Sequence, residues 1–284
     1  GFSDFVTMYG GTPVLYTRDY DKEIDVDELS RFLEKDSNFK YATLVHGDTP
    51  SGMLNDATKI TKLLKSKGIL TVVDAVSTMF GDKLDVSNID ILCGGSQKVI
   101  SAPPGLTINV LSKDAKDAIN NRKTPIRAFY ANLKTFFNYY EEKWFPYTMP
   151  ISDINGLDVA IRNIEEDPDI FARHERIASA VRKAVTEAGL EIYVKSGYAN
   201  TVTAFVVPES TTASDILETL KKDHNILIAG SFGVFGGKLI RIGHMGTNAQ
   251  KDIIIQLMDA LDKTFDKLGI KLKASLKEVF DKNC

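Results

Sequence analysis

The sequence lacks several features that would place it at once in a familiar class of protein. Its 284 residues include two cysteines, Cys93 and Cys284, too few for a disulfide framework, so we expect a reducing, cytoplasmic location. The 35 basic and 38 acidic side chains give a net charge of −3, and without a basic excess we expect no nucleic-acid partner. No apolar run approaches the roughly 20 residues of a membrane-spanning helix, and no signal-peptide pattern opens the chain, so we expect no membrane partner either.

The remaining residues have the composition of a globular protein, with 43% apolar and 26% charged side chains. In the first half, short apolar runs at 41–45 and 69–73 predict buried strands, and they flank a helical pattern over 56–67. A strand, a helix and a strand in that order form a βαβ unit, which predicts a mostly parallel sheet flanked by helices. Further strands are expected at 89–92 and 106–110.

The stretch 120–150 is irregular and rich in aromatic residues. Two interpretations remain open: the aromatics anchor a core beneath a long connection, or they form an oligomer interface, where aromatic side chains are enriched. Pro146 and Pro150 punctuate its end and mark the expected domain boundary. We therefore predict a large domain over 1–150 and a smaller α+β domain over 151–284.

The second half predicts a mixture of helices and strands. A long helical pattern covers about 153–188, and a shorter one covers 213–222. Thr247 and Gln250 have the spacing of a capping box, which predicts the start of the last helix. The expected strands are 191–194, 202–207, 226–228 and 239–242.

Polar residues follow three of the predicted strands, in segments 46–52, 74–77 and 94–98. Ligands of open α/β sheets bind at the carboxyl ends of strands. Asp74 and Lys98 could be an ordinary solvated ion pair, the commonest role for such residues. They could also serve pyridoxal 5'-phosphate, which needs a lysine for its Schiff base and an acid beside its ring nitrogen. The spacing alone leaves both interpretations open.

The segments around these residues carry a resemblance to a known family. Five of them occur in one order: 46–52 (HGDTPSG), 73–77 (VDAVS), 95–98 (GSQK), 102–105 (APPG) and 239–243 (LIRIG). Together they resemble the class V, fold-type I PLP-dependent aminotransferases, in particular the alanine–glyoxylate and serine–pyruvate group. The resemblance runs from residue 1 to about 268, and it implies an α/β fold with a mostly parallel sheet and a smaller C-terminal domain.

The resemblance implies a role for each of several residues. Lys98 would form the Schiff base with the cofactor and carry the proton between the substrate Cα and cofactor C4′. Asp74 would pair with the pyridinium nitrogen, and Val76 would pack against one face of the ring. A nearby cofactor cation and burial would lower the pKa of Lys98, as a base requires.

Four further residues complete the implied site. Thr49 would bond the phenolic oxygen of the cofactor, and Gln97 would help to hold its phosphate. Arg241 would bind the substrate carboxylate, for which a planar guanidinium is well suited. Thr148 would reach the phosphate in the neighbouring subunit of a homodimer with shared active sites.

The expected activity is transamination between a small amino acid, alanine-like or serine-like, and a 2-oxo acid such as pyruvate or glyoxylate. A PLP-dependent lyase or desulfurase on the same fold is the first alternative, but those enzymes usually carry a histidine before the lysine, where Gln97 stands here. A catalytically inactive scaffold is the second. The four histidines and two cysteines show no metal-ligand spacing, so no metal site is expected.

The sequence departs from the family pattern at three places. Asp48 stands where the family often has Glu, and Pro50 stands where it has Ser or Thr. The phosphate-binding turn at a helix N-terminus, expected upstream of residues 1–5 together with an aromatic that stacks on the ring, is not found. We therefore expect the native protein to be longer at its N-terminus.

Overall fold

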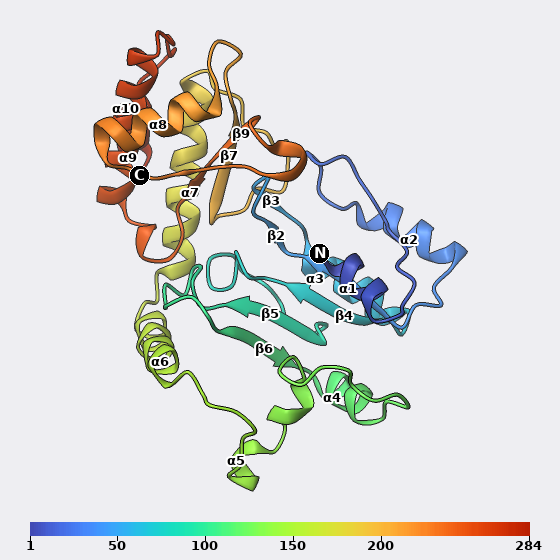
Figure 1. Ribbon diagram of the computed structural model, residues 1–284. Coiled ribbons are helices and arrows are strands. Elements are labelled where there is room, and N and C mark those ends of the chain that lie inside the picture. Colours follow the sequence, from blue (N-terminus) through green and yellow to red (C-terminus); the bar gives the residue numbers. More distant parts are fainter.

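The computed structural model describes residues 1–284 and contains two main sheets, each with its own helices, and a two-stranded hairpin (Figure 1). The larger sheet consists of β1 (Tyr41–Val45), β4 (Leu70–Asp74), β5 (Ile91–Gly95) and β6 (Thr107–Leu111), in that spatial order. The first three strands run parallel and β6 runs antiparallel to β5. The predicted βαβ unit is confirmed, and the carboxyl ends of β1, β4 and β5 share one edge of the sheet.

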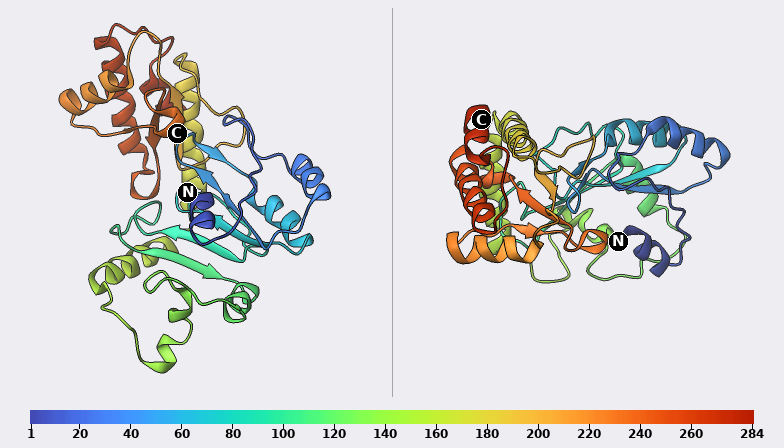
Figure 2. Two further views of the ribbon diagram at one scale, coloured as in Figure 1. Left: turned by 45° about the vertical axis from the view of Figure 1, so that its right-hand side comes forward. Right: turned by 90° about the horizontal axis from the view of Figure 1, so that it is seen from above.

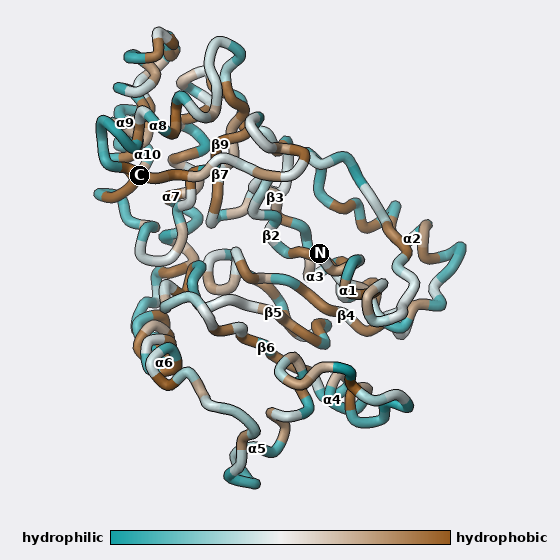
Figure 3. Tube along the Cα trace, in the orientation of Figure 1, coloured by the Kyte–Doolittle hydropathy of each residue, from teal (hydrophilic) through white to brown (hydrophobic).

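Two helices of the first half, α2 (Val26–Lys35) and α3 (Ala57–Ser66), bury apolar residues against this sheet. Helix α4 (Lys113–Asn120) buries only Ala115, and α1 (Phe2–Met8) buries no residue. Leu33 of α2 and Ile60 of α3 pack into one core with Val73 of β4. Figure 3 shows the difference in hydropathy between the mostly hydrophobic β4 and the mostly hydrophilic α4.

A short hairpin follows β1 and carries the first polar segment. It consists of β2 (Gly47–Asp48) and β3 (Met53–Leu54), which pair antiparallel. Gly52 has a φ of 81°, and a side chain there would meet the backbone of Ala204. The hairpin therefore lies directly against the smaller sheet.

The helical pattern over 153–188 is two helices and not one. They are α6 (Ile151–Glu165) and α7 (Ile170–Glu187), and Pro168 lies between them. Proline has no backbone N–H and disfavours a helical residue before it, so the helix cannot continue through this point. The break lets α6 pack beside Ile100 and Ala102, while α7 joins a separate core.

The smaller sheet is antiparallel and consists of β7 (Val202–Val206), β9 (Leu239–Gly243) and β8 (Ala229–Gly230), in that spatial order. Its helices are α7, α8 (Ala213–His224), α9 (Lys251–Lys267) and α10 (Leu276–Asn283), and they cover the side away from the larger sheet (Figure 2). Ile240 and Ile242 of β9 face this helical core. Because side chains alternate along a strand, Arg241 faces the opposite way, toward the hairpin.

Three sequence predictions for the second half are wrong in detail. Residues 191–194 form no strand, only an isolated bridge between Ile192 and Phe205. The strand expected at 226–228 is instead the two-residue β8 at 229–230. The helix expected to be the last is α9, which is followed by α10; it begins at Lys251 and not after a capping box at Thr247, because the backbone N–H of Thr247 donates to Ser101.

The aromatic stretch between α4 and α6 does not anchor a core. It contains the 3₁₀ turn η1 (Leu133–Phe136) and the short α5 (Tyr139–Glu142), which Figure 1 shows extending away from the larger sheet. Tyr130 and Trp144 are more than half exposed, and the rings stack mainly on one another. The interpretation as core anchors is therefore wrong, and the interface interpretation stays a prediction.

None of the helices combines the length and the apolar character that crossing a membrane requires.

Candidate active site

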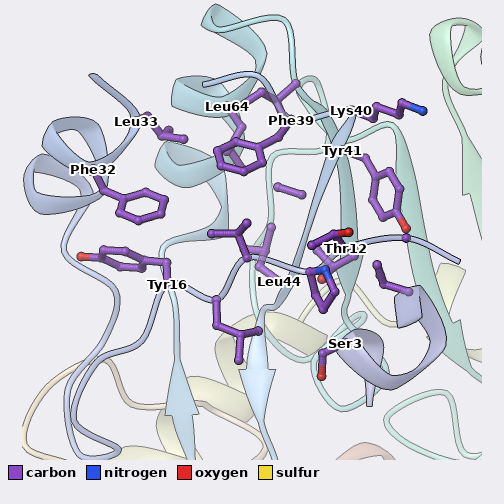
Figure 4. Close-up of a pocket in the computed structure, with 18 of the residues that line it drawn as sticks. Ser3, Thr12, Tyr16, Phe32, Leu33, Phe39, Lys40, Tyr41, Leu44 and Leu64 are labelled. Atoms are coloured by element: carbon purple, nitrogen blue, oxygen red, sulfur yellow. The ribbon is translucent and has the colours of Figure 1, made fainter. Parts of the chain in front are cut away.

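A cavity of about 550 Å³ lies away from the predicted site. Residues 10–16, helix α2 and strand β1 line it, as Figure 4 shows for Tyr16, Phe32 and Leu44. None of the predicted site residues lines this cavity. The polar groups gather instead where β1, β4 and β5 end.

Asp74 is the last residue of β4 and is half-buried. Its register partners are Val45 of β1 and Cys93 of β5, which place it in the middle of the sheet edge. One carboxylate oxygen, Oδ1, accepts the N–H of Val76 at 2.8 Å, and Oδ2 accepts no hydrogen bond from the protein. Burial raises the pKa of the Cys93 thiol, and the nearby Asp74 charge raises it further.

Val76 and Gln97 converge above Gly95. A Cβ at Gly95 would lie 2.9 Å from Oε1 of Gln97 and 3.2 Å from Cγ1 of Val76. A side chain at this position would displace the end of the Gln97 side chain and crowd Val76. The loops after β4 and β5 thus meet over this glycine, with Asp74 beside them.

Lys98 lies in the tight loop that follows β5 and is half-buried. Buried Ser96 fixes this loop, because its Oγ donates to the carbonyl of Pro103 at 2.6 Å and its own carbonyl accepts the N–H of Ala102 at 2.9 Å. The carbonyl of Lys98 accepts the N–H of Ser101 at 2.9 Å. The Lys98 amine takes part in none of the salt bridges of the structure, so it is free to meet another group.

Arg241 reaches from β9 toward the hairpin. Its Nε and Nη2 donate to the carbonyl of Gly230 at 3.0 and 2.8 Å, and its Nη1 donates to the carbonyl of Thr49 at 3.5 Å. The ring of Phe232 lies 5.3 Å from the guanidinium carbon. Burial lowers the pKa of Arg241, and Asp48 opposes the shift.

Only backbone carbonyls hold this guanidinium, so its charge is not neutralised by a bonded carboxylate. A guanidinium has five N–H donors, of which three are used here. The terminal nitrogens Nη1 and Nη2 each keep one donor for a further partner. This arrangement suits the binding of a carboxylate.

Thr49 and Pro50 lie at the tip of the hairpin between the two sheets. The carbonyl of Pro50 accepts the hydroxyl of Ser231 at 2.8 Å, and that of Thr49 accepts Arg241. Asp48 accepts the hydroxyl of buried Ser51 at 2.5 Å. The departure at Pro50 therefore leaves intact the carbonyl that fixes the loop.

Thr148 is not brought together with the other predicted residues. It is exposed in the irregular stretch before α6, beside Tyr147, whose hydroxyl donates to the carbonyl of Tyr130 at 3.5 Å. Its predicted contact is with a second subunit, so its role stays a prediction.

His46 lies near the site but points into the protein. It is buried, and Nδ1 shares a 2.9 Å hydrogen bond with the hydroxyl of Thr78. Burial lowers the pKa of His46 to about 4. It is therefore a neutral residue that joins the ends of β1 and β4.

A buried polar junction that was not predicted from the sequence joins Asp82, Asn200 and His244. Both carboxylate oxygens of Asp82 accept the N–H of Asn200 at 3.1 Å, and burial raises the pKa of Asp82 to about 6, against the charge of Arg182. Fully buried His244 donates from Nδ1 to the carbonyl of Asn200 at 3.1 Å and accepts the hydroxyl of Thr203 at Nε2. Burial lowers the pKa of His244 to about 3.

These groups together define what the site can do. Asp74 has a carboxylate oxygen free to hold a protonated nitrogen, and Lys98 has an amine free to act as nucleophile or base. Arg241 can hold an anionic substrate. The structure contains no cluster of three or more side chains that could hold a metal ion.

The chain is similar in sequence to a known family and to several known proteins. Residues 8–252 match the family described as aminotransferase class-V. An uncharacterized aminotransferase of Methanocaldococcus jannaschii is 32% identical over 284 residues, covering 98% of this chain and 73% of that protein. The alanine–glyoxylate aminotransferase of Callithrix jacchus is 31% identical over 228 residues, covering 77% of this chain and 55% of that protein.

A solved structure is also similar. The crystal structure of pyridoxamine–pyruvate aminotransferase from Mesorhizobium loti matches with a TM-score of 0.89 at 30% identity, covering 94% of this chain and 71% of that one. The chain thus spans between about half and three quarters of the length of these three relatives.

Proposed function

The chain belongs to the class-V aminotransferase family, and from this premise we propose that it transfers an amino group between a small amino acid and a 2-oxo acid. Alanine or serine is the proposed donor class, and pyruvate or glyoxylate the proposed acceptor class. Two relatives are named for alanine–glyoxylate and pyridoxamine–pyruvate transamination, and this supports the proposed acceptors. The fold is the predicted fold-type I α/β fold of PLP-dependent aminotransferases.

The observation that carries the proposal is a pair of half-buried cations, Lys98 and Arg241, neither of which forms a salt bridge, together with an Asp74 carboxylate oxygen that accepts no hydrogen bond. Lysine and arginine side chains that are half-buried without an acidic partner are costly, and a ligand with anionic groups would compensate for them. Pyridoxal 5'-phosphate and an amino acid together supply such groups.

The residues at the sheet edge fit this cofactor. Asp74 would hold the ring nitrogen protonated through Oδ2, while the bond from Val76 N–H to Oδ1 fixes the carboxylate. Val76 would cover one ring face, and Gln97, which meets it over Gly95, would help to hold the phosphate. The Thr49 hydroxyl would bond the phenolic oxygen. When bound, the cofactor supplies an aldehyde that accepts the amino group and a ring that withdraws electrons.

Lys98 and Arg241 would act on the substrate. The Lys98 amine would hold the cofactor and, once released, move a proton between the substrate Cα and the cofactor C4′. Arg241 would hold the substrate carboxylate through Nη1 and Nη2 and so orient the Cα toward Lys98. The ring of Phe232 lies over the guanidinium in a cation–π contact and would help to fix its orientation.

We further propose that the protein is a homodimer in which Thr148 reaches the phosphate of the partner's site. The exposed aromatic stretch around it supports this, because Tyr130 and Trp144 leave large apolar surfaces uncovered. We also propose that the chain divides at residue 150 into a large cofactor-binding domain and a small domain.

A screen of amino donors with the purified protein tests the activity. The protein with pyridoxal 5'-phosphate is mixed with alanine or serine and either pyruvate or glyoxylate, and the new amino acid and 2-oxo acid are measured. We expect a matched pair of products that disappears in Lys98→Ala. Sulfide release from cysteine without amino transfer would favour a desulfurase, and no reaction with any donor would favour an inactive scaffold.

A further inference from the structure

A fully buried histidine lies behind the loop that carries Lys98. His174 of α7 has no exposed surface, and its Nδ1 donates to the carbonyl of Ile170 one turn earlier at 2.6 Å. Since a carbonyl can only accept, the proton is on Nδ1 and Nε2 is left as an acceptor. Nε2 accepts the backbone N–H of Gly246 at 3.0 Å. Burial lowers the pKa of His174, which agrees with a neutral ring that accepts at Nε2.

Gly246 is in direct contact with the lysine loop. Its φ is 59°, and a Cβ there would lie 2.0 Å from the Oγ of Ser101 and 2.5 Å from the carbonyl oxygen of Val99. No side chain fits in this position. The backbone that His174 holds is therefore pressed against the two residues that follow closely after Lys98.

Ser101 links this backbone to Lys98. Its Oγ accepts the N–H of Thr247 at 3.0 Å, and its own N–H donates to the carbonyl of Lys98 at 2.9 Å. Ser101 has a φ of 61°, in the left-handed region that residues other than glycine rarely adopt. Such a conformation persists only where surrounding contacts impose it, and the contacts here come from residues 246–247.

We infer that His174 is a positioning residue for Lys98: through Gly246, Thr247 and Ser101 it holds the lysine loop against α7. The inference rests on the proposed role of Lys98. The neutral ring offers a fixed acceptor in a dry environment, so the loop has one arrangement. Without the acceptor, the N–H of Gly246 would be buried and unpaired, and the backbone would shift to pair it.

Two substitutions at His174 separate hydrogen bonding from packing. His174→Leu removes the acceptor at similar volume, and His174→Gln keeps an amide oxygen within reach of the Gly246 N–H. Leu220→Val in the core of α8 is the control for general destabilisation, because Leu220 is fully buried and belongs to the helical core, far from the loop in the chain.

The first readout is the rate at which pyridoxal 5'-phosphate labels Lys98, trapped with borohydride and counted on the Lys98 peptide. The second is kcat and KM for the amino donor. For His174→Leu we expect both the labelling rate and kcat to fall by about 10- to 100-fold, since a displacement near 1 Å has such an effect, with KM nearly unchanged. His174→Gln should recover most of both rates, and Leu220→Val should change neither.

Equal rates in His174→Leu and the wild type would overturn the inference, and so would an equal loss in Leu220→Val. Absence of a Lys98 adduct in the wild type would instead overturn the proposed function. Should His174→Leu fail to fold, Ser101→Gly decides the matter: glycine tolerates the positive φ, while the hydroxyl that accepts Thr247 is lost. We expect a lower kcat with an unchanged unfolding temperature; an unchanged kcat would refute the link.

Discussion

Two of the polar junctions between the halves of the chain differ in how completely their groups are satisfied. Behind the lysine loop, buried His174 is bonded to buried Gly246, and exposed Ser101 is bonded to exposed Thr247, so the polar atoms of this junction are paired within the protein. Beside the hairpin, Arg241 is held only by carbonyls and keeps its charge and two donors free. The first junction can fix a geometry, and the second can bind a ligand.

A methyl group added in each junction should show this difference most strongly. Gly246→Ala would combine a positive φ with overlap of Ser101 and Val99, so we expect a loss of about 3–4 kcal/mol in the free energy of unfolding. Gly233→Ala, beside Phe232, has a similar φ of 61° but open space around it, and should cost about 1 kcal/mol. Urea unfolding of the two variants measures both values. Equal losses would show that the first junction is not tightly packed.

Acid should weaken the buried region and leave Arg241 charged. The folded-state pKa values of His46 and His244, about 4 and about 3, lie below the usual value of 6.5. Such groups favour folding above pH 6.5, and their contribution is lost as pH falls, by about 2 kcal/mol each at pH 5. Asp82, whose pKa is raised to about 6, has the opposite effect. It favours folding at low pH and offsets about 1 kcal/mol of this loss in the free energy of unfolding.

The net expectation is a fall of about 3 kcal/mol in the free energy of unfolding between pH 7.5 and pH 5. Urea unfolding at the two pH values measures it. In His46→Gln the fall should shrink by about 2 kcal/mol, because its contribution no longer titrates. A stability that stays level or rises toward pH 5 would contradict the assignment of neutral, buried histidines.

Replacing Arg241 should affect binding more than folding. Arg241→Gln would remove the charge that holds the substrate carboxylate, and we expect kcat/KM for an amino acid donor to fall by about 100-fold. The matched control is a primary amine without a carboxylate, for which the variant should lose almost nothing. A similar loss with both donors would mean that Arg241 supports the fold and does not bind the carboxylate.

The smallest expected effect comes from Ser231, which joins the second junction to the hairpin. Ser231→Ala would remove the 2.8 Å bond to the carbonyl of Pro50, worth about 1 kcal/mol, and should lower kcat/KM a few-fold through Thr49 and Arg241. Ser231→Thr keeps the hydroxyl and should behave as the wild type. If Ser231→Ala is fully active, the hairpin is fixed by other contacts.

The same contrast explains what the sequence could predict. Asp74 and Lys98 follow apolar runs within a short stretch of chain, and the strand-end rule for parallel sheets then brings their segments together. The apolar stripe of α9, with Leu257, Leu261 and Phe265, is likewise local and is confirmed as buried.

The junction behind the lysine loop could not be predicted in the same way, because its partners are distant in the sequence. His174 lies 72 residues from Gly246, and Ser101 lies 146 residues from Thr247. The second of these contacts also takes the N–H at the predicted capping box, so a tertiary bond overrides a local signal. The predicted partner of Thr148 belongs to a second subunit, so its role stays a prediction.

The most direct test of whether Lys98 binds the cofactor is reduction with borohydride after incubation with pyridoxal 5'-phosphate, followed by peptide mass mapping. We expect one pyridoxyl adduct, on Lys98. The adduct should be lost in Lys98→Arg, which keeps the charge but not the amine. An adduct that is absent, or that is found on another lysine while Lys98 stays unmodified, would contradict this role of Lys98.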